Sequence, residues 1–181
     1  RGSRVSSTAI RQALIYGQVA LARRLLARPF ALEGEIIRAS GLGKQLQIPT
    51  ANLATPNELI PRRGVYVTIL KIDGHRYKAV TNIGFRPTVC GSEQDVPLSI
   101  ETHILDFGDD IYGKKASLEF FVRLRDERRF ADEQALVRQI RTDIGRARRY
   151  FSWLERVIGK SFDADGAKNL FDHARWGEKV I

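Results

Sequence analysis

The chain has 181 residues, of which 43% are hydrophobic and 28% are charged, a composition ordinary for one soluble globular domain. Cys90 is its only cysteine, which excludes an intrachain disulfide and a metal site built from several cysteines. No apolar run approaches the roughly 20 residues needed to cross a bilayer. There is no signal peptide either, so we expect a cytoplasmic protein without a membrane segment.

The net charge is +9, with a pI of about 10.0, and two interpretations fit this excess. One is a polyanion partner, either nucleic acid or a phosphorylated small molecule; the other is a generally basic surface. Much of the charge comes from arginines at helical spacing: Arg138, Arg141, Arg146, Arg148 and Arg149. That spacing favours a solvated helix face, and the sequence has no RNA-binding aromatic motif, so nucleic acid is not the expected partner.

Two short helices are predicted at the start of the chain. The hydroxyls of Ser6, Ser7 and Thr8 suit a helix N-cap. Residues 18–28 carry leucines at helical spacing, and Pro29 ends that pattern. The sequence contains no methionine, even at position 1, and we therefore expect a fragment of a longer chain.

Residues 40–52 begin as a glycine-containing loop and end in a strand. Gly41 and Gly43 allow the backbone to approach a ligand closely, and Lys44 adds a positive charge. Thr50 and Asn52 face the same side of extended structure, where their oxygens suit Mg²⁺ and its phosphate ligands. The parts are those of a nucleotide phosphate site, although an ordinary loop ahead of a strand is the simpler interpretation of this segment alone.

The remaining pattern is β-rich and then helical. Strands are predicted at residues 30–37, 50–54, 64–72, 76–83, 98–106 and 116–124. Asp73-Gly74 indicates a tight hairpin, residues 84–87 a turn, and residues 132–159 a long helix that Asp132 caps. Along residues 116–124 we expect Leu118, Phe120, Val122 and Leu124 to share one face. A shorter helix is predicted near residues 166–176. Together these elements indicate a small β-barrel capped by helices.

Glu101 is the first candidate for a catalytic residue. It lies in the middle of a predicted strand, on the face opposite Ile100 and Ile104, and His103 shares its face. If that face lines a cleft, its carboxylate can accept a proton from a substrate hydroxyl. A solvent-facing glutamate on a half-exposed sheet explains the pattern equally well.

Three other segments carry residues that could bind a ligand. Residues 82–88 combine polar and cationic groups with a turn, and residues 123–130 carry arginines and an aromatic ring that suit an anion or a planar ring. A plain turn and a charged connector are the simpler interpretations of these two. Residues 161–172 resemble a degraded calcium-binding loop, for which a helix N-cap at Asp163 or Asp165 is the better account.

In combination, the motifs resemble the riboflavin kinase module found at the C-terminus of bacterial bifunctional riboflavin kinase/FAD synthetases. The motifs that carry this resemblance are Gly41-x-Gly43-Lys44, Pro49-Thr50-Ala51-Asn52, Gly64-Val65-Tyr66, Asn82-Ile83-Gly84-x-Arg86-Pro87-Thr88, Glu101-Thr102-His103, Ile111-Tyr112-Gly113 and Leu124-Arg125-x-Glu127-x-x-Phe130. The match covers about residues 30–150. Residues 5–11 resemble the last motif of the adenylyltransferase domain that precedes the kinase in such enzymes, whose His-x-Gly-His motif is absent here.

The resemblance implies a mainly β fold, a six-stranded antiparallel Greek-key barrel with helical additions at both ends. We therefore expect residues 1–28 to be a helical remnant of the preceding domain and residues 29–151 to be the riboflavin kinase domain. Residues 152–181 are expected to be a helical extension, for which no role is apparent.

The resemblance also implies transfer of the ATP γ-phosphate to riboflavin, which gives FMN and ADP. Glu101 is then the catalytic base. The implied nucleotide-binding residues are Gly41, Gly43, Lys44, Thr50 and Asn52, the last two also holding Mg²⁺. The implied flavin-binding residues are Asn82, Arg86, Arg125, Glu127 and Phe130. Two positions depart from the family pattern, Gln47 in place of glycine and Leu42 in place of a basic residue. A non-catalytic flavin-binding barrel, or a basic nucleic-acid-binding barrel, remains the alternative.

Overall fold

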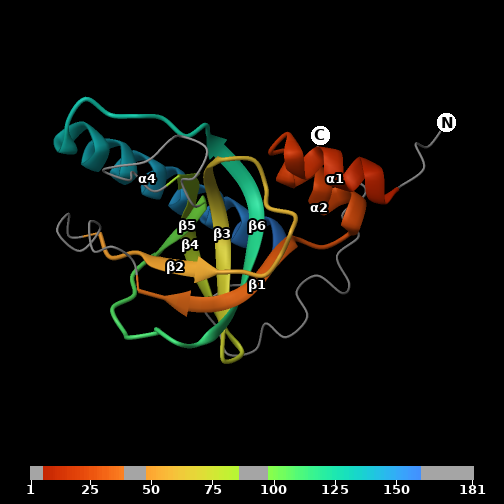
Figure 1. Cartoon of the computed structure of the whole chain (residues 1–181), viewed down its shortest axis with the longest axis horizontal. Coiled ribbons are helices and arrows are strands. Elements are labelled where there is room, and N and C mark those ends of the chain that lie inside the picture. The colour runs from red at the N-terminus through yellow and green to blue at the C-terminus, as the bar shows by residue number, and fades with distance from the viewer. Residues whose placement is uncertain (1–5, 39–47, 86–97, 160–181) are drawn as a thin grey trace.

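The computed structural model describes residues 6–38, 48–85 and 98–159, and at its centre the strands close into an antiparallel barrel (Figure 1). The strands are β1 (Phe30–Ile37), β2 (Ala51–Ala54), β3 (Gly64–Ile72), β4 (His75–Phe85), β5 (Leu98–Ile104) and β6 (Lys115–Arg125). Their order around the barrel is β1-β2-β5-β4-β3-β6, and β6 pairs back onto β1. Closure pairs every one of these strands on both sides, and it confirms the predicted six-stranded barrel.

The barrel interior is filled by alternate residues of the strands, as a period of two requires. Its largest fully buried side chains are Leu32, Ile36, Tyr66, Leu70, Ile83, Leu118 and Phe120. Among them lies a short chain of buried hydroxyls. Thr81 Oγ1 lies 2.8 Å from Thr68 Oγ1 and 3.0 Å from Thr102 Oγ1, so the polar groups inside the barrel satisfy one another.

Two N-terminal helices, α1 (Ser7–Ile15) and α2 (Val19–Leu26), pack beside β6 and β1 (right side of Figure 1). Ser6 is the N-cap of α1, because its Oγ accepts a hydrogen bond from the Ala9 N–H at 3.2 Å. α2 ends at Leu26, since Ala27 adopts the left-handed conformation two residues before Pro29. Both predicted helices are confirmed, and they bury side chains in the same core as the barrel.

The long helix α4 (Glu133–Ile158) lies against the outer surface of β3 and β4 (Figure 1). Asp132 caps its first turn by accepting a hydrogen bond from the Ala135 N–H at 2.6 Å, and Gly159 ends it at a φ of 66°. Phe151 and Leu154 are buried against the barrel. The five arginines predicted to form a solvated face are all exposed. In the described part of the chain, no helix is long and apolar enough to cross a membrane.

Two local predictions are wrong. Residues 84 and 85 continue β4 instead of forming a turn, because Gly84 pairs with Ser99 and Phe85 with Leu98. The expected single face of β6 is also wrong: Phe120 faces the interior, whereas Val122 and Leu124 pack with the outer cluster. The β3–β6 register shifts between Val67 and Thr68, and such an irregularity moves the following side chains to the other face.

Candidate active site

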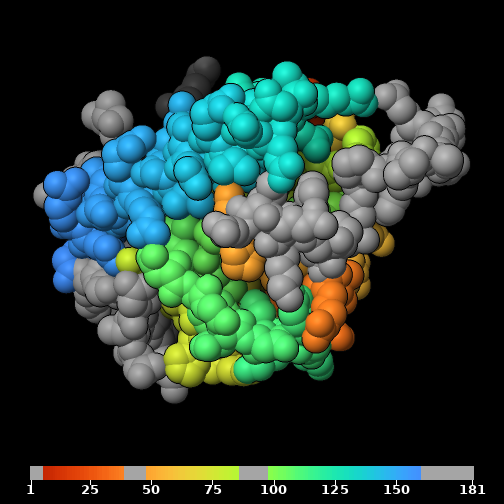
Figure 2. Space-filling model, turned by 90° about the vertical axis from the view of Figure 1, so that its left-hand side faces the viewer, coloured from red at the N-terminus to blue at the C-terminus, as the bar shows by residue number. Residues whose placement is uncertain are grey.

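Three of the predicted site residues form one row across the outside of the barrel. Asn52 of β2 pairs directly with Glu101 of β5, which pairs in turn with Asn82 of β4. The neighbours of Glu101 on its own strand, Ile100 and Thr102, point into the interior and are buried. The prediction that Glu101 lies on the face opposite Ile100 and Ile104 is therefore confirmed, and that face is the outside of the barrel. Figure 2 looks at one side of the molecule, where the green segment that includes β5 lies below α4, in cyan and blue.

Ser99 joins two members of this row. It precedes Glu101 by two residues on the same face of β5, and it is only 5% exposed. Its Oγ lies 3.1 Å from Asn52 Oδ1 and 3.0 Å from Glu101 Oε1. The sequence interpretation missed Ser99, although the alternation that placed Glu101 also placed Ser99 on this face.

Asn52 carries a buried polar atom that has no hydrogen-bond partner among the described residues. The atom is its Nδ2, and the residue is 2% exposed. A buried donor without a partner costs about 1–3 kcal/mol. Such an atom in a cluster of polar side chains is typical of a binding site, where the ligand supplies the missing partner.

Thr50 lies two residues before Asn52, at the entry to β2, and is partly exposed. The entry is held to β5 by His103, whose Nδ1 lies 2.9 Å from the carbonyl oxygen of Pro49. A hydroxyl and an amide beside a carboxylate fit Mg²⁺, which takes few protein ligands and fills its coordination shell with phosphate and water oxygens. Within the described ranges no three His, Cys, Asp or Glu residues cluster as ligands, and a Mg²⁺ ion carried by ATP does not need such a cluster.

Glu127 lies against β4 because Gly84 has no side chain. A Cβ atom added to Gly84 would sit 2.0 Å from Glu127 Oε1 and 3.1 Å from Asn82 Nδ2. Glu127 Oε2 also lies 3.8 Å from Arg63 Nη1, an ion pair that solvent screens. The structure therefore brings Glu127 next to Asn82, at the end of the row that starts with Asn52.

Arg125 and Phe130 form a second group, beside α4. Arg125 Nε donates to Asp143 Oδ2 at 2.8 Å, and Gln139 Nε2 donates to the other carboxylate oxygen at 2.8 Å. Asp143 is 1% exposed. The Arg125 guanidinium carbon lies 5.7 Å from the centre of the Phe130 ring. These two predicted flavin residues thus lie together, with the arginine already paired to α4.

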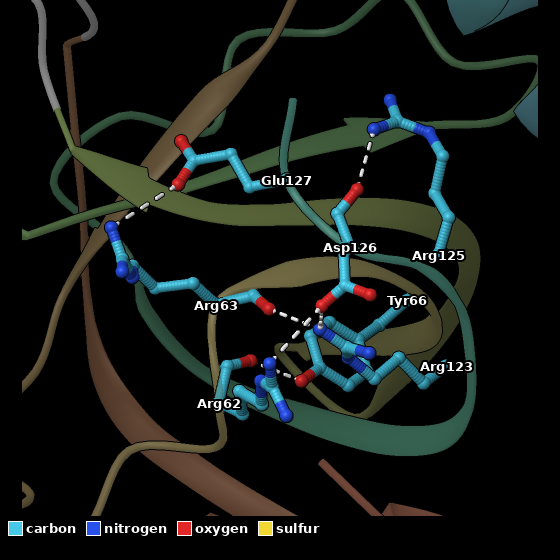
Figure 3. A network of polar contacts seen from close by, with 7 residues as sticks. All are labelled: Arg62, Arg63, Tyr66, Arg123, Arg125, Asp126 and Glu127. Carbon is cyan, nitrogen blue, oxygen red and sulfur yellow. Dashed lines mark hydrogen bonds and ion pairs between the residues drawn. The ribbon is translucent and has the colours of Figure 1, made fainter. Parts of the chain in front are cut away.

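The segment between β6 and α4 is tied to the barrel by a network around Arg123 (Figure 3). Arg123 Nη2 donates to the carbonyl oxygen of Arg63 at 2.5 Å and to Asp126 Oδ1 at 2.6 Å. The hydrogen bond and charge of Arg123 lower the pKa of Asp126. Burial raises the pKa of Tyr66, whose hydroxyl donates to the carbonyl of Arg62.

The same network reaches the turn between α1 and α2. Gly17, at a φ of 74°, lies so close that a Cβ atom would be 2.7 Å from Arg123 Cδ. The Arg62 N–H donates to the carbonyl of Leu14 at 3.0 Å. The N-terminal helices therefore support the residues that hold Asp126 and Glu127 in place.

Other predictions lie outside the described residues. They concern Gly41, Leu42, Gly43, Lys44, Gln47, Arg86, the calcium-like loop at 161–172 and the helix at 166–176. Of the predicted site residues that the structure describes, Asn52, Asn82, Glu101 and Glu127 share one outer face, with Thr50 at its edge.

The chain is a closed antiparallel barrel with a cluster of polar side chains on its outer face. Comparison with known proteins is more specific: the profile of the riboflavin kinase (flavokinase) family matches residues 26–151. This chain belongs to the riboflavin kinase family. That assignment agrees with the resemblance carried by its motifs.

Two relatives illustrate the similarity. A bifunctional riboflavin kinase/FMN adenylyltransferase of Pseudomonas fluorescens is 42% identical over 147 residues, which cover 81% of this chain and 46% of the relative. The protein of the same description from Bacillus subtilis (strain 168) is 37% identical over 154 residues, covering 84% of this chain and 48% of the relative. The chain thus spans about half the length of the curated relatives it matches.

The fold also matches a solved structure. A crystal structure from Streptococcus pneumoniae, described as that of a macrolide-efflux protein, aligns with a TM-score of 0.74 at 32% identity. The alignment covers 81% of this chain and 47% of that chain. The likeness supports the barrel and its flanking helices.

Proposed function

We propose that this chain is a riboflavin kinase, which transfers the γ-phosphoryl group of ATP to the 5′-hydroxyl of riboflavin and releases FMN and ADP. The observation that carries the proposal is the hydrogen-bonded cluster of buried Asn52 and Ser99 with half-buried Glu101, on the outer face of a riboflavin kinase family barrel. It sets a carboxylate directly beside an amide, one end of which has no partner among the described residues. Phosphoryl transfer needs such positioning more than it needs covalent chemistry.

Glu101 acts on the acceptor. Its carboxylate takes the proton of the riboflavin 5′-hydroxyl as that oxygen forms its bond to the γ-phosphorus. The bond between the γ-phosphorus and the β–γ bridging oxygen breaks, and ADP leaves with the electron pair. The row of Asn52, Glu101 and Asn82 supports this assignment, because it sets polar groups on both sides of the carboxylate.

Thr50 and Asn52 act on the donor. They would hold a Mg²⁺ ion together with the phosphates of ATP, and the ion supplies charge neutralisation at the transferring group. The buried amide of Asn52 supports this role, since one end of it has no partner among the described residues. By the family resemblance we add Gly41, Gly43 and Lys44 to the nucleotide site.

Asn82, Glu127, Arg125 and Phe130 orient the flavin in this proposal, and the resemblance adds Arg86. Asn82 lies beside Glu101, and Glu127 lies beside Asn82, where Asn82 can donate and Glu127 can accept hydrogen bonds with polar atoms of the substrate. The guanidinium carbons of Arg125 and Arg128 lie 5.7 and 4.9 Å from the centre of the Phe130 ring, and such a group of cations and an aromatic ring suits a planar ligand.

The proposal also covers the parent protein and its location in the cell. The relatives are named for both riboflavin kinase and FMN adenylyltransferase, and each is about twice as long as the matched region. We infer that the FMN formed here is the substrate of an adenylyltransferase domain preceding this region in the parent protein. The proposal also places the protein in the cytoplasm, where ATP is available.

Replacing Glu101 with alanine separates chemistry from binding. Riboflavin affinity, followed by flavin fluorescence, should stay within about twofold of wild type, because the ring is held by other residues. The turnover number should fall by about 10²–10⁴-fold, as it does when a general base is lost. If riboflavin affinity collapses together with turnover, or if turnover persists, Glu101 is not the base.

A further inference from the structure

The hydroxyl of Ser99 has one proton and, among the described residues, two oxygen atoms within hydrogen-bond distance. Asn52 Oδ1 is 3.1 Å and Glu101 Oε1 3.0 Å from its Oγ, and neither of these oxygens can donate while Glu101 is ionised. The proton satisfies only one of them. The other contact then sets two oxygen lone pairs against each other at a site that is 5% exposed.

A charged acceptor takes the proton. Hydrogen bonds to a carboxylate are roughly twice as strong as those between neutral groups, so the Ser99 proton goes to Glu101. Ser99 Oγ then turns its lone pairs toward Asn52. The amide of Asn52 satisfies them when its two ends exchange places, with Nδ2 donating to Ser99 Oγ.

The exchange also removes the unpartnered donor. In the placed orientation Asn52 Nδ2 is buried with no partner among the described residues, while Oδ1 faces a hydroxyl that donates elsewhere. The oxygen and nitrogen of an amide are nearly alike in size, and the hydrogen-bond network decides which is which. After the exchange Nδ2 is paired, and Oδ1 becomes the open end of the amide.

We propose that Ser99 is a positioning residue that links the two halves of the site. The chain runs from Asn52 Nδ2–H to Ser99 Oγ, and from Ser99 Oγ–H to Glu101 Oε1. It fixes the carboxylate that receives the substrate proton and turns the Asn52 oxygen toward a hard cation. The inference rests on the proposed function, because it uses the roles of Asn52 and Glu101.

The test uses substitutions that differ in the hydroxyl. Ser99→Thr keeps it, whereas Ser99→Val has the same shape as threonine without it, and Ser99→Ala removes it with the least added bulk. Ser117→Ala is the matched control: Ser117 Oγ donates to Glu33 Oε1 at 2.7 Å, so this variant also loses a serine–carboxylate hydrogen bond, but on the β1–β6 pair.

Three quantities are measured for each variant. They are the turnover number, the riboflavin dissociation constant, and the Mg²⁺-dependent part of ADP affinity from calorimetry with and without the ion. For Ser99→Ala and Ser99→Val we expect turnover and Mg²⁺-dependent ADP affinity each to fall by about 10–100-fold, with riboflavin affinity within about twofold. Ser99→Thr and Ser117→Ala should stay close to wild type.

Several results would overturn the link. One is a loss of turnover with unchanged Mg²⁺-dependent ADP affinity, because Ser99 would then serve Glu101 alone. Another is a Ser99→Val variant that matches Ser99→Thr in both turnover and Mg²⁺-dependent ADP affinity. The comparison of these two variants tests the role of the hydroxyl even if Ser99→Ala fails to fold. A wild-type chain that forms no FMN refutes the proposed function instead, and the ADP calorimetry still tests the link between Ser99 and Asn52.

Discussion

At the scale of single residues, Asp126 shows how the outer segment is held to the barrel. Its carboxylate accepts a 2.6 Å hydrogen bond from Arg123 and lies 3.6 Å from Arg62 Nη2. The hydrogen bond from Arg123 and the attraction of its charge lower the pKa of Asp126 from its ordinary value of 3.8. Glu127, the next residue, is thereby kept close to Asn82.

The lowered pKa makes a prediction about pH. A carboxyl group whose pKa is lower in the folded chain stabilises that chain above the unfolded-state value, and the stabilisation is lost as the pH falls through the folded-state value. The difference in melting temperature between wild type and Asp126→Asn should therefore be constant above the ordinary pKa of 3.8. It should shrink toward zero below that pH. A difference that grows on acidification would contradict the assigned contact.

The sequence predicts the face on which Glu101 lies, but it does not reveal the contacts of Ser99. The alternation along β5 sets the face of both residues, but it says nothing about their neighbours. The role of Ser99 becomes visible only with the register that places Asn52 opposite Glu101. Cross-strand register depends on the whole barrel, so a single strand sequence does not reveal it.

At the scale of elements, a buried ion pair fastens α4 to β6. The side chains of Arg125 and Asp143 are 16% and 2% exposed, and their 2.8 Å contact is completed by Gln139. Removing one partner of such a pair leaves the other charge uncompensated in a poorly solvated place. The pair therefore fixes the angle at which the chain leaves β6 toward Phe130.

Asp143→Ala should lower the free energy of unfolding by about 3 kcal/mol, near the lower end for a broken buried pair because Arg125 keeps some contact with solvent. Urea unfolding measures this loss. Asp143→Asn is the control, since it keeps a hydrogen-bond acceptor for Arg125 and should lose less. A loss below about 1 kcal/mol for the alanine variant would show that the pair contributes little.

The local sequence predicts the bounds of most helices and strands, and the exceptions depend on how neighbouring strands pair. Asp132 and Gly159 bound α4, and Asp73-Gly74 supplies the two positive φ angles of a tight hairpin turn. Gly84, in contrast, is read locally as a turn residue but continues β4, because Ser99 of β5 pairs with it. The irregularity in β6 likewise depends on β3 and leaves no local signal.

At the scale of the whole molecule, the closed barrel separates stability from chemistry. In the described part of the chain its interior is mostly apolar and includes the linked threonine hydroxyls, while its outer face carries the Asn52–Ser99–Glu101 cluster. The exposed arginines of α4 account for much of the net charge of +9 without forming part of this cluster. The net charge therefore resides largely on an exposed helix face, apart from the polar row of Asn52, Glu101 and Asn82.

The most direct test of the central claim is the product stoichiometry of the purified chain with riboflavin, ATP and Mg²⁺. We predict one FMN formed for each ADP released, measured by chromatography, with both products formed about 10²–10⁴-fold more slowly by Glu101→Ala. Riboflavin binding without ADP or FMN would instead indicate a non-catalytic flavin-binding barrel. No turnover combined with an RNA affinity that falls steeply with salt would indicate a nucleic-acid-binding protein, and either result would contradict the kinase.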